Sequence, residues 1–532
     1  MTDTVGLPRG WASATLPDVI GPQGLLTDGD WVETEDQDPD GDVRLTQLAD
    51  IGDGVFRDRS ARFMTQERAA ALGCTFLEKG DVMVARMPDP LGRACLFPGS
   101  TVPSVTAVDV CIIRPALPDV DNRWLMHTLN SPAVRGAIAQ LQSGSTRKRI
   151  SKKNLCTIPL PVAPAAEQCR IADNTESYLT RLDNAVALLK RVEQNLKRYR
   201  ASVLKAAVEG RLVPTEAELT RREGREYEPA SELLKRILVE RKARWIEDAA
   251  EKARAKAEDK ARKAGQLWTA QDDAATLEKE RAKATKQYAE PLDPDTTELP
   301  DLPEGWCWAL LEQLTFPATS GSRGWAQYYT DDGPLFIRAQ DLKMDALTTV
   351  SIAHVSPPVD AEGMRTRVQQ HDLLVTVTGA NVTKAAFVRH AIGEAYVSQH
   401  VGLCRPVLSA TAEYVHLWIV CPGGGRSQLL EAAYGAGKPG LNLQNLHELI
   451  VALPPLIEQS RVVDRVGAAL SAVSRQQATA DSSRARVLRL RQAVLKWAFE
   501  GKLAKQDPND ESASVLLGRI REQHRARRGT TP

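Results

Sequence analysis

The sequence predicts an α+β fold built from two copies of one unit, and two observations support this prediction. The pair Glu167-Gln168 recurs as Glu458-Gln459, 291 residues later, and residues 167–210 align with residues 458–501 without a gap. Each copy begins with short apolar runs separated by Gly, Pro and Asp, which indicate strands, and ends with apolar residues at helical spacing. A period this long indicates a duplicated domain, because solenoid repeats have periods of about 20–50 residues.

The composition is typical of a globular protein and excludes several classes. The 532 residues are 42% hydrophobic and 26% charged, with a net charge of +1. No apolar run approaches the ~20 residues of a membrane helix, and no secretory signal is evident, so we expect a cytoplasmic protein without membrane contact. The eight cysteines are scattered without a Cys-x-x-Cys pair, so neither a disulfide framework nor a structural metal is expected.

The first part of each copy, residues 1–164 and residues 299–455, is expected to be a globular mixed α/β domain. Apolar runs at 81–85 and 94–97 are matched by runs at 372–375 and 385–388, and all four indicate short strands. Gly92 and Gly379 indicate turns between them. Residues 123–142 and 414–434 have the composition of helices.

The second part of each copy predicts a long helix that packs against one partner helix, as in a coiled coil. Pro164 and Pro455 precede the expected helix starts, and Gly210 and Gly501 indicate the ends. The expected partner is the helix of the other copy, and the alternative is that each stripe packs onto its own globular domain. The residues expected in this packing are Leu182, Val186, Leu189, Leu196 and Val203 in the first copy and Leu490, Val494 and Trp497 in the second.

Two helical regions, residues 165–298 and 456–532, therefore follow the globular domains. Within the first, residues 215–290 are rich in Ala, Lys, Arg and Glu, which favours a solvated helix, with partial disorder as the alternative. The few apolar anchors there are Leu233, Leu234, Ile237 and Trp245, and Leu516, Leu517 and Ile520 echo the first three near the C-terminus. The Pro-rich residues 291–303 indicate a linker.

No catalytic signature is present in the sequence. There is no Asn-Pro-Pro-Tyr/Phe tetrapeptide to hold an adenine amino group for methyl transfer. Gly435, Gly437 and Lys438 resemble a phosphate loop, but the upstream glycine is absent and Pro439 stands where a hydroxyl residue belongs. We therefore predict a recognition protein with no catalytic residue and no metal site.

Three sequence elements that occur in both copies resemble the specificity subunits of Type I restriction–modification systems. The first opens a domain as Leu-Pro-x-Gly-Trp, at residues 7–11 and 302–306. The second is the proline-rich approach to Glu458-Gln459-Ser460-Arg461, and the third is the helix end at residues 203–212. The resemblance covers essentially the whole chain, although the opening at residues 7–11 lacks the second tryptophan that follows in the other copy.

The resemblance implies a specific fold. Two globular mixed α/β target-recognition domains are separated by long antiparallel coiled-coil helices, in a tandem pseudo-twofold repeat. Each domain would bind one half of a bipartite, asymmetric DNA target. A helix of residues 167–210 would be about 65 Å long, close to two DNA turns of about 34 Å each, so the helices would set the spacing between the half-sites.

The resemblance also implies partners and cofactors. The partners would be double-stranded DNA, two modification (methyltransferase) subunits and restriction (endonuclease and translocase) subunits. This chain would bind no cofactor, because S-adenosylmethionine is held by the modification subunits and ATP and Mg by the restriction subunits. The alternatives from other classes are a scaffold protein that does not bind DNA and a divergent fused restriction or methylation enzyme.

Two basic turns are the expected phosphate contacts, since backbone N–H groups and long cations fix a protein on DNA without recognising sequence. A cluster taken alone is more often a solvated loop. In the first domain the turn begins at Ser143-Gly144, and its candidate residues are Ser145, Thr146, Arg147, Lys148, Arg149, Lys152 and Lys153. The equivalent turn of the second domain is residues 435–438, with Lys438 as the candidate.

The expected base contacts lie in the second domain, in residues 320–329. An arginine pairs with guanine, a glutamine pairs with adenine, and tyrosines stack on bases. The candidates are Ser322, Arg323, Gln327, Tyr328 and Tyr329, and the alternative for the tyrosines is ordinary packing. Gln47 and Arg338, which are 291 residues apart, follow predicted strands and are weaker candidates.

Overall fold

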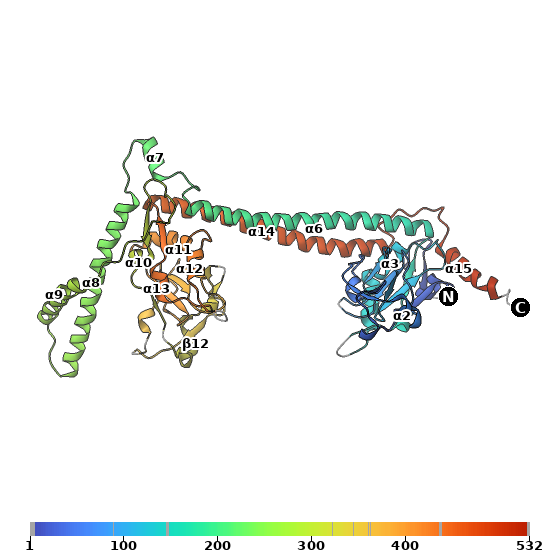
Figure 1. The fold of residues 1–532 in the computed structure, drawn as a ribbon, viewed down its shortest axis with the longest axis horizontal. Coiled ribbons are helices and arrows are strands. Elements are labelled where there is room, and N and C mark those ends of the chain that lie inside the picture. The colour runs from blue at the N-terminus through green and yellow to red at the C-terminus, as the bar shows by residue number, and fades with distance from the viewer. Residues whose placement is uncertain are drawn as a thin grey trace. The chain divides into compact units, whose positions relative to one another are not determined.

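The computed structural model describes residues 6–88, 90–144, 148–321, 323–343, 345–359, 361, 363–435 and 439–528. The chain divides into two compact units. Unit 1 comprises residues 1–192 and 479–532, and unit 2 comprises residues 193–478 (Figure 1). Each unit therefore contains one globular domain and parts of both long helices. No helix in the described ranges is long and apolar enough to cross a membrane.

The first domain is a mixed α/β domain, as predicted. A four-stranded sheet has the order β2(Leu25–Asp28), β8(Val110–Arg114), β5(Val82–Ala85), β6(Ala94–Leu96). A three-stranded sheet has the order β4(Arg62–Met64), β3(Val43–Thr46), β7(Ser104–Thr106), and β1(Ala12–Thr15) pairs with β9(Pro159–Val162). The helices are α1(Leu16–Ile20), α2(Gln66–Ala71), α3(Asn122–Leu129), α4(Pro132–Gln140) and α5(Lys152–Leu155).

The second domain repeats this topology. Its four-stranded sheet has the order β11(Thr319–Ser320), β19(Val401–Cys404), β16(Leu373–Thr376), β17(Ala385–Phe387), and its three-stranded sheet has the order β15(Ala353–Val355), β12(Tyr329–Ile337), β18(Ala395–Val397). Two further pairs are β10(Cys307–Leu310) with β20(Ile450–Leu453) and β13(Leu342–Lys343) with β14(Ala346–Leu347). The helices are α10(Leu311–Leu314), α11(Ala412–Val420), α12(Gly425–Ala432) and α13(Leu443–His447).

The pairing register confirms that the two domains are copies. In the first domain β3 and β7 run parallel, with Leu45 opposite Val105. In the second, β12 and β18 run parallel, with Phe336 opposite Tyr396. Each residue of the second pair lies 291 positions after its counterpart, which is the period of the sequence repeat.

The segments 123–142 and 414–434 are helical, as predicted, and each is divided into two helices. In the first domain the break lies at Asn130, whose side chain leaves the helix to pair with the backbone N–H and C=O of Ala94 in β6. Ser131 then caps α4, and its hydroxyl accepts from the Val134 N–H. In the second domain Pro422, Gly423 and Gly424 separate α11 from α12.

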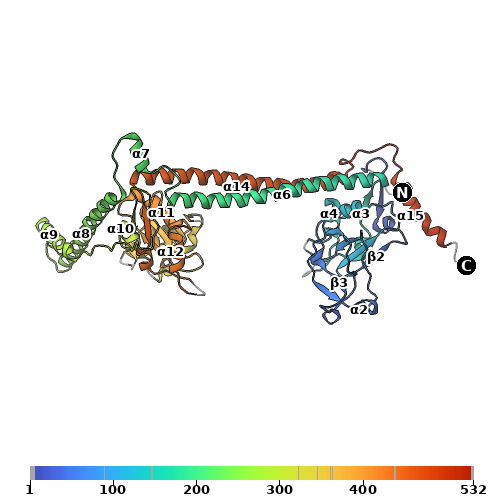
Figure 2. The same cartoon turned by 45° about the horizontal axis from the view of Figure 1, so that its top comes forward.

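The two long helices are α6(Ala165–Val208) and α14(Leu456–Phe499), each of 44 residues. In unit 1 the start of α6 packs with the end of α14, where Ile171 and Ala172 share a core with Leu495 and Ala498. In unit 2 the end of α6 packs with the start of α14 through Val203, Ala207 and Val466, among others. The helices are therefore antiparallel within each unit, and α3 lies beside the first turns of α6 (Figure 2).

The structure places the predicted helix-packing residues at three levels of exposure. Val203 and Val494 are buried, and Leu182, Val186, Leu189 and Leu196 are half-buried. Leu490 and Trp497 are 37% and 46% exposed, which does not fit their prediction as packing residues. Near the end of α14 the buried residues are Val494, Leu495, Ala498 and Phe499, and Trp497 lies on another side of the helix because each residue turns a helix by about 100°.

The charged segment is helical, as its composition predicted. It comprises α7(Glu216–Glu223), α8(Ala230–Lys263) and α9(Ala270–Gln287), and α8 and α9 pack on each other as a hairpin (Figure 1). Leu233 and Ile237 are buried in the core of unit 2, so these predicted anchors are confirmed. Arg241 is also buried, and it donates from Nε to the Thr315 carbonyl and from a terminal nitrogen to the Tyr288 hydroxyl.

Equivalent contacts hold the helix starts in the two units. The Trp11 indole donates to Glu167 at 3.0 Å, and the Trp306 indole donates to Glu458 at 2.9 Å. Burial raises the pKa of both carboxyls, although these hydrogen bonds oppose the shift. A matching backbone hydrogen bond is present in each unit. The N–H of Ala513, at the start of α15(Ala513–Arg528), donates to the Gly10 carbonyl, and the N–H of Ala230, at the start of α8, donates to the Gly305 carbonyl.

Candidate nucleic-acid interface

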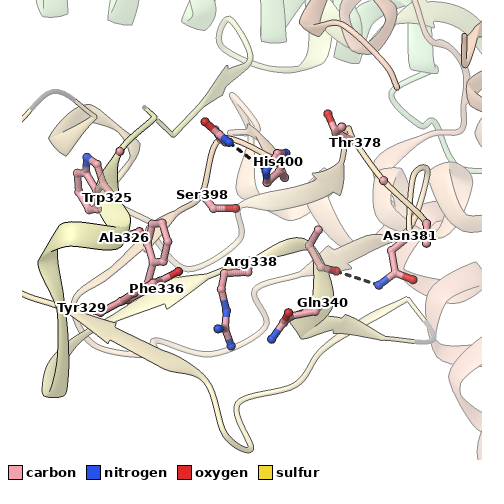
Figure 3. Close-up of a pocket in the computed structure, with 15 residues that line it drawn as sticks. Trp325, Ala326, Tyr329, Phe336, Arg338, Gln340, Thr378, Asn381, Ser398 and His400 are labelled. Carbon is pink, nitrogen blue, oxygen red and sulfur yellow. Dashed lines mark hydrogen bonds between the residues drawn. The ribbon is translucent and has the colours of Figure 1, made fainter. Parts of the chain in front are cut away.

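The second domain contains a cavity of about 430 Å³ at one edge of its three-stranded sheet (Figure 3). Strands β12 and β18 are parallel, so their carboxyl ends meet at the same edge. β12 ends at Ile337 and is followed by Arg338, while β18 ends at Val397 and is followed by Ser398. The cavity is lined by Gly324, Trp325, Ala326, Tyr329, Phe336, Arg338, Ala339, Gln340, Thr378, Gly379, Ala380, Asn381, Ser398, Gln399 and His400.

One wall of the cavity is aromatic. Trp325 stacks on Phe336 with ring centroids 5.7 Å apart, and Tyr329 meets the same Phe336 edge-on at 5.7 Å. Trp325 and Phe336 are buried, whereas Tyr329 is 45% exposed at the rim. The wall is therefore rigid where it joins the core and open to solvent at Tyr329.

Polar side chains line the rest of the cavity. Arg338 bonds to Asp341 through Nε at 3.2 Å, and the Asn381 amide donates to the Ala339 carbonyl at 3.2 Å. The Ser398 hydroxyl and the Gln399 Oε1 atom are buried, and neither has a hydrogen-bond partner in the part of the chain that the structure describes. An aromatic wall facing such polar groups suits a planar ligand with a polar edge.

Glycine is required where the chain passes the cavity. A Cβ atom on Gly321 would lie 2.0 Å from the Val397 carbonyl oxygen, and one on Gly29 would lie 2.3 Å from the Ala107 carbonyl oxygen. Both distances are far below a van der Waals contact. The two glycines follow β11 and β2, which hold equivalent places in the two sheets. This close approach of two backbone segments is thus a shared feature of both domains.

Residues that flank the turn predicted to contact phosphate lie beside the same cavity. Tyr434 and Gly440 form an antiparallel bridge that closes the turn, and the Gly379 N–H donates to the Pro439 carbonyl at 3.1 Å. Gly379 itself lines the cavity. In the first domain Ser143 and Arg149 form the equivalent bridge, 291 residues earlier. In the second domain, Pro439 beside the predicted turn therefore contacts the wall of the cavity that the candidate residue Tyr329 also lines.

The predicted DNA-contacting residues divide into three groups. Ser145, Thr146, Arg147, Ser322 and Lys438 lie outside the described residues. Lys148, Arg149, Lys153, Arg323 and Gln327 are exposed, and Lys152 is half-buried in the first turn of α5. The third group consists of Tyr328 and Tyr329, which differ in their burial.

Tyr328 and Tyr329 have different surroundings. Tyr328 is half-buried and packs edge-on against Trp325 at 6.1 Å, so the packing alternative holds for it. Tyr329 lines the cavity and is available to a ligand. Arg338, which had been a weaker candidate, lines the cavity too.

The sequence interpretation missed Trp325, Asn381, Ser398 and Gln399, which also line the cavity. Parallel pairing of β12 with β18 joins segments about 60 residues apart, and no local pattern signals it. The one available signal was the period of 291, which relates Arg338 to Gln47.

The first domain has a cavity at the equivalent place, and its lining is different. It has a volume of about 760 Å³ and includes Gln47, the counterpart of Arg338, together with Ala107, Val108 and Asp109, the counterparts of Ser398, Gln399 and His400. Its other lining residues are Asp30, Trp31, Val32, Glu33, Thr34, Glu35, Gln37 and Arg62. Burial raises the pKa of Asp30, although the Thr75 N–H bonds to its carboxylate.

Among the described residues, no group of three or more His, Cys, Asp or Glu side chains is arranged to hold a metal ion. No protein-family model matches the chain.

Three characterised proteins are similar to this chain in sequence. The EcoBI Type I restriction enzyme specificity subunit of Escherichia coli is 24% identical over 444 residues, which cover 80% of this chain and 77% of that protein. The EcoKI specificity subunit of Escherichia coli strain K12 is 22% identical over 76% of this chain and 72% of its own length. The StySPI specificity subunit of Salmonella potsdam is 32% identical over a shorter stretch, 18% of this chain and 20% of its own length.

Two solved structures share the fold. The HsdS subunit from Thermoanaerobacter tengcongensis matches 94% of this chain and all of its own with a TM-score of 0.53 and 17% identity. A chain from a study of assembly and conformational transition in the type I R-M system matches 93% of this chain and 99% of its own, with a TM-score of 0.60 and 16% identity.

Proposed function

We infer that this chain is a specificity subunit of a Type I restriction–modification system, since its sequence relatives and its fold neighbours belong to that family. Its role is sequence-specific DNA recognition within the restriction–modification complex.

The observation that carries the detailed proposal is the pair of cavities with equivalent positions and different linings. Two copies of one domain provide two recognition surfaces, so the target has two parts. Arg338, Ser398 and Gln399 in one domain stand where Gln47, Ala107 and Val108 stand in the other. Because hydrogen-bonding groups discriminate between base pairs, domains with such different groups bind different half-sites, and the target is asymmetric.

The proposed partners are double-stranded DNA, two modification subunits and restriction subunits. In this proposal the chain itself is non-catalytic. The modification subunits hold S-adenosylmethionine and methylate adenine, and the restriction subunits hold ATP and Mg. A cytoplasmic location follows from this role, because the bacterial DNA that is methylated lies there.

The test is genome-wide detection of methylated adenine in cells that carry this chain together with its neighbouring methyltransferase subunit. Cells that lack only this chain are the control. We expect a bipartite asymmetric motif that disappears in the control. Methylation that is the same in both strains would contradict the proposal, and DNA binding by the purified complex would then distinguish an inactive specificity subunit from a scaffold.

A further inference from the structure

The shape of the second-domain cavity restricts what it can bind on DNA. The edges of stacked bases lie at the floor of the major groove, about 12 Å wide and 8.5 Å deep, so a protruding protein element must reach them. A concave surface instead accepts a group that projects from the double helix. On DNA such a group is either a backbone phosphate or a base that has left the stack.

The chemistry of the lining favours a base over a phosphate. Arg338 is the one lysine or arginine among the described lining residues, and its guanidinium is bonded to Asp341. Trp325, Phe336 and Tyr329 form a wall of aromatic rings, on which a base stacks. The volume of about 430 Å³ lies within the range of cavities that hold small planar ligands.

Two residues that line the cavity each carry a buried polar atom that has no hydrogen-bond partner among the described residues. Ser398 is only 4% exposed, and one of these atoms is its hydroxyl oxygen. The Oε1 atom of Gln399 is likewise buried and unpartnered, while the amide nitrogen of Gln399 lies 3.0 Å from the His400 ring. Most buried polar groups are paired, so such a pair of atoms indicates a position completed by a ligand. Figure 3 shows Ser398 between His400 and Arg338.

We propose that this cavity receives one unstacked nucleobase of the half-site bound by the second domain, with its ring beside Tyr329 and its polar edge at Ser398 and Gln399. The Ser398 hydroxyl both donates and accepts, and Gln399 Oε1 accepts from an amino or imino group of the base. The inference rests on the proposed function. It adds two specificity-determining residues and a mode of recognition, and it assigns no chemical step to the chain.

The first domain supplies a matched variant for the test. Residues 107 and 108, the counterparts of Ser398 and Gln399, are Ala107 and Val108. The double substitution Ser398→Ala and Gln399→Val therefore introduces side chains that the same sheet edge already carries in the other copy. In cells with this variant, we expect the methylation motif to lose preference at one position of the second half-site, by roughly tenfold.

The same experiment contains its own control. An unchanged first half of the motif shows that the variant folds and assembles with its partners. A second half-site that keeps its preference at every position would overturn the inference while leaving the proposed function intact. Absence of any chain-dependent motif with the unmodified protein would instead contradict the proposed function.

A second measurement tests whether the base leaves the stack. 2-Aminopurine, whose fluorescence rises on unstacking, is placed at each position of the second half-site in duplexes bound to the assembled complex. The adenine that a methyltransferase modifies also leaves the stack, so each duplex is compared with the Tyr329→Ala complex. We expect one position, distinct from the methylated adenine, to show an enhanced signal that changes in that variant. Unstacking confined to the methylated adenine would overturn the inference.

Discussion

The two globular domains share their internal framework and differ at the sheet edge where each has a cavity. In both, a buried aspartate pairs with an arginine of the neighbouring strand, Asp81 with Arg114 and Asp372 with Arg405. By contrast, the residues that follow the parallel strands differ in charge and in hydrogen-bonding capacity. One sheet therefore has two separable roles, because the strands hold the domain together and the residues after the strands form the variable surface.

The difference at the sheet edge is chemical as well as positional. The second cavity combines Arg338, Asn381 and Gln399 with an aromatic wall. The first cavity contains Asp30, Glu33, Glu35 and Asp109, and its Trp31 is 70% exposed. An acidic lining repels phosphate and accepts hydrogen bonds from the amino groups of bases. The lining of the first cavity is therefore the more acidic of the two, although it also contains Arg62.

The largest expected effect tests whether the frameworks are equal. Asp81→Ala and Asp372→Ala each remove a nearly fully buried carboxylate that bonds two guanidinium nitrogens and one backbone N–H. Each substitution removes the buried partner of an arginine, although Arg114 keeps its ion pair with Glu78 and Arg405 keeps its bond to the Arg367 carbonyl. We expect each to lower the free energy of unfolding of its own unit by about 3–5 kcal/mol. Urea denaturation followed by hydrogen exchange measures the two units separately. A loss of stability in only one unit would show that the two Asp–Arg pairs do not stabilise their domains equally.

A smaller effect should distinguish the two helix starts. Glu458 accepts from the Trp306 indole and from the Glu216 N–H, whereas Glu167 accepts from the Trp11 indole. An unsatisfied buried donor costs about 1–3 kcal/mol. We expect Glu458→Ala to destabilise unit 2 more than Glu167→Ala destabilises unit 1.

Thermal unfolding of the two variants measures that difference, with Trp306→Phe as the control that removes one donor from the Glu458 site. Glu216, whose N–H donates to Glu458, forms ion pairs of its own through its carboxylate. Burial alone would raise the pKa of Glu216, but Arg225 and Arg461 outweigh burial and lower it. Equal losses for Glu458→Ala and Glu167→Ala would show that the Glu216 contact adds nothing.

Arg338→Gln sharpens the comparison of the cavities, because it gives the second domain the residue that the first has at position 47. Arginine pairs with guanine and glutamine with adenine, and a good pair contributes about 1–3 kcal/mol of discrimination. We expect the preference at one position of the second half-site to change, and the first half-site to remain as it was. The methylation motif of cells with the variant shows both halves. A change in the first half would contradict the separation of the two domains.

The smallest expected effect concerns the basic turn of the first domain. Lys148 and Arg149 are exposed beside the bridge between Ser143 and Arg149. If both contact phosphates, Lys148→Ala with Arg149→Ala should reduce the slope of log K against log salt by about 0.9 per lost contact and leave sequence preference unchanged. Titration of the purified complex with its target and with unrelated DNA measures both quantities. An unchanged slope would place the turn away from the DNA.

The sequence predicted the repeated framework well because its signals are local or periodic. The apolar spacing of α6 indicated the helix and the burial of Val203, and the Pro and Gly residues indicated its ends. In α14 the apolar stripe is thinner, so the sequence did not define which side of that helix is buried, and Trp497 was wrongly assigned to it. The cavity was harder to predict from the sequence, because Ser398 and Arg338 come together only through the parallel pairing of β12 with β18, which depends on the whole domain.

The composition of the two units has a consequence for how such proteins diversify. Each unit contains helix segments from both copies of the repeat, so replacing one whole copy would alter the cores of both units. Replacing only residues 12–162 or 307–453 leaves the long helices intact and retains the acceptors for Trp11 and Trp306. Recombination between relatives at the first strand and the last strand of a domain would therefore generate new specificities without a new scaffold. The segment that recombination exchanges to change specificity is then shorter than the segment that was duplicated to produce the protein.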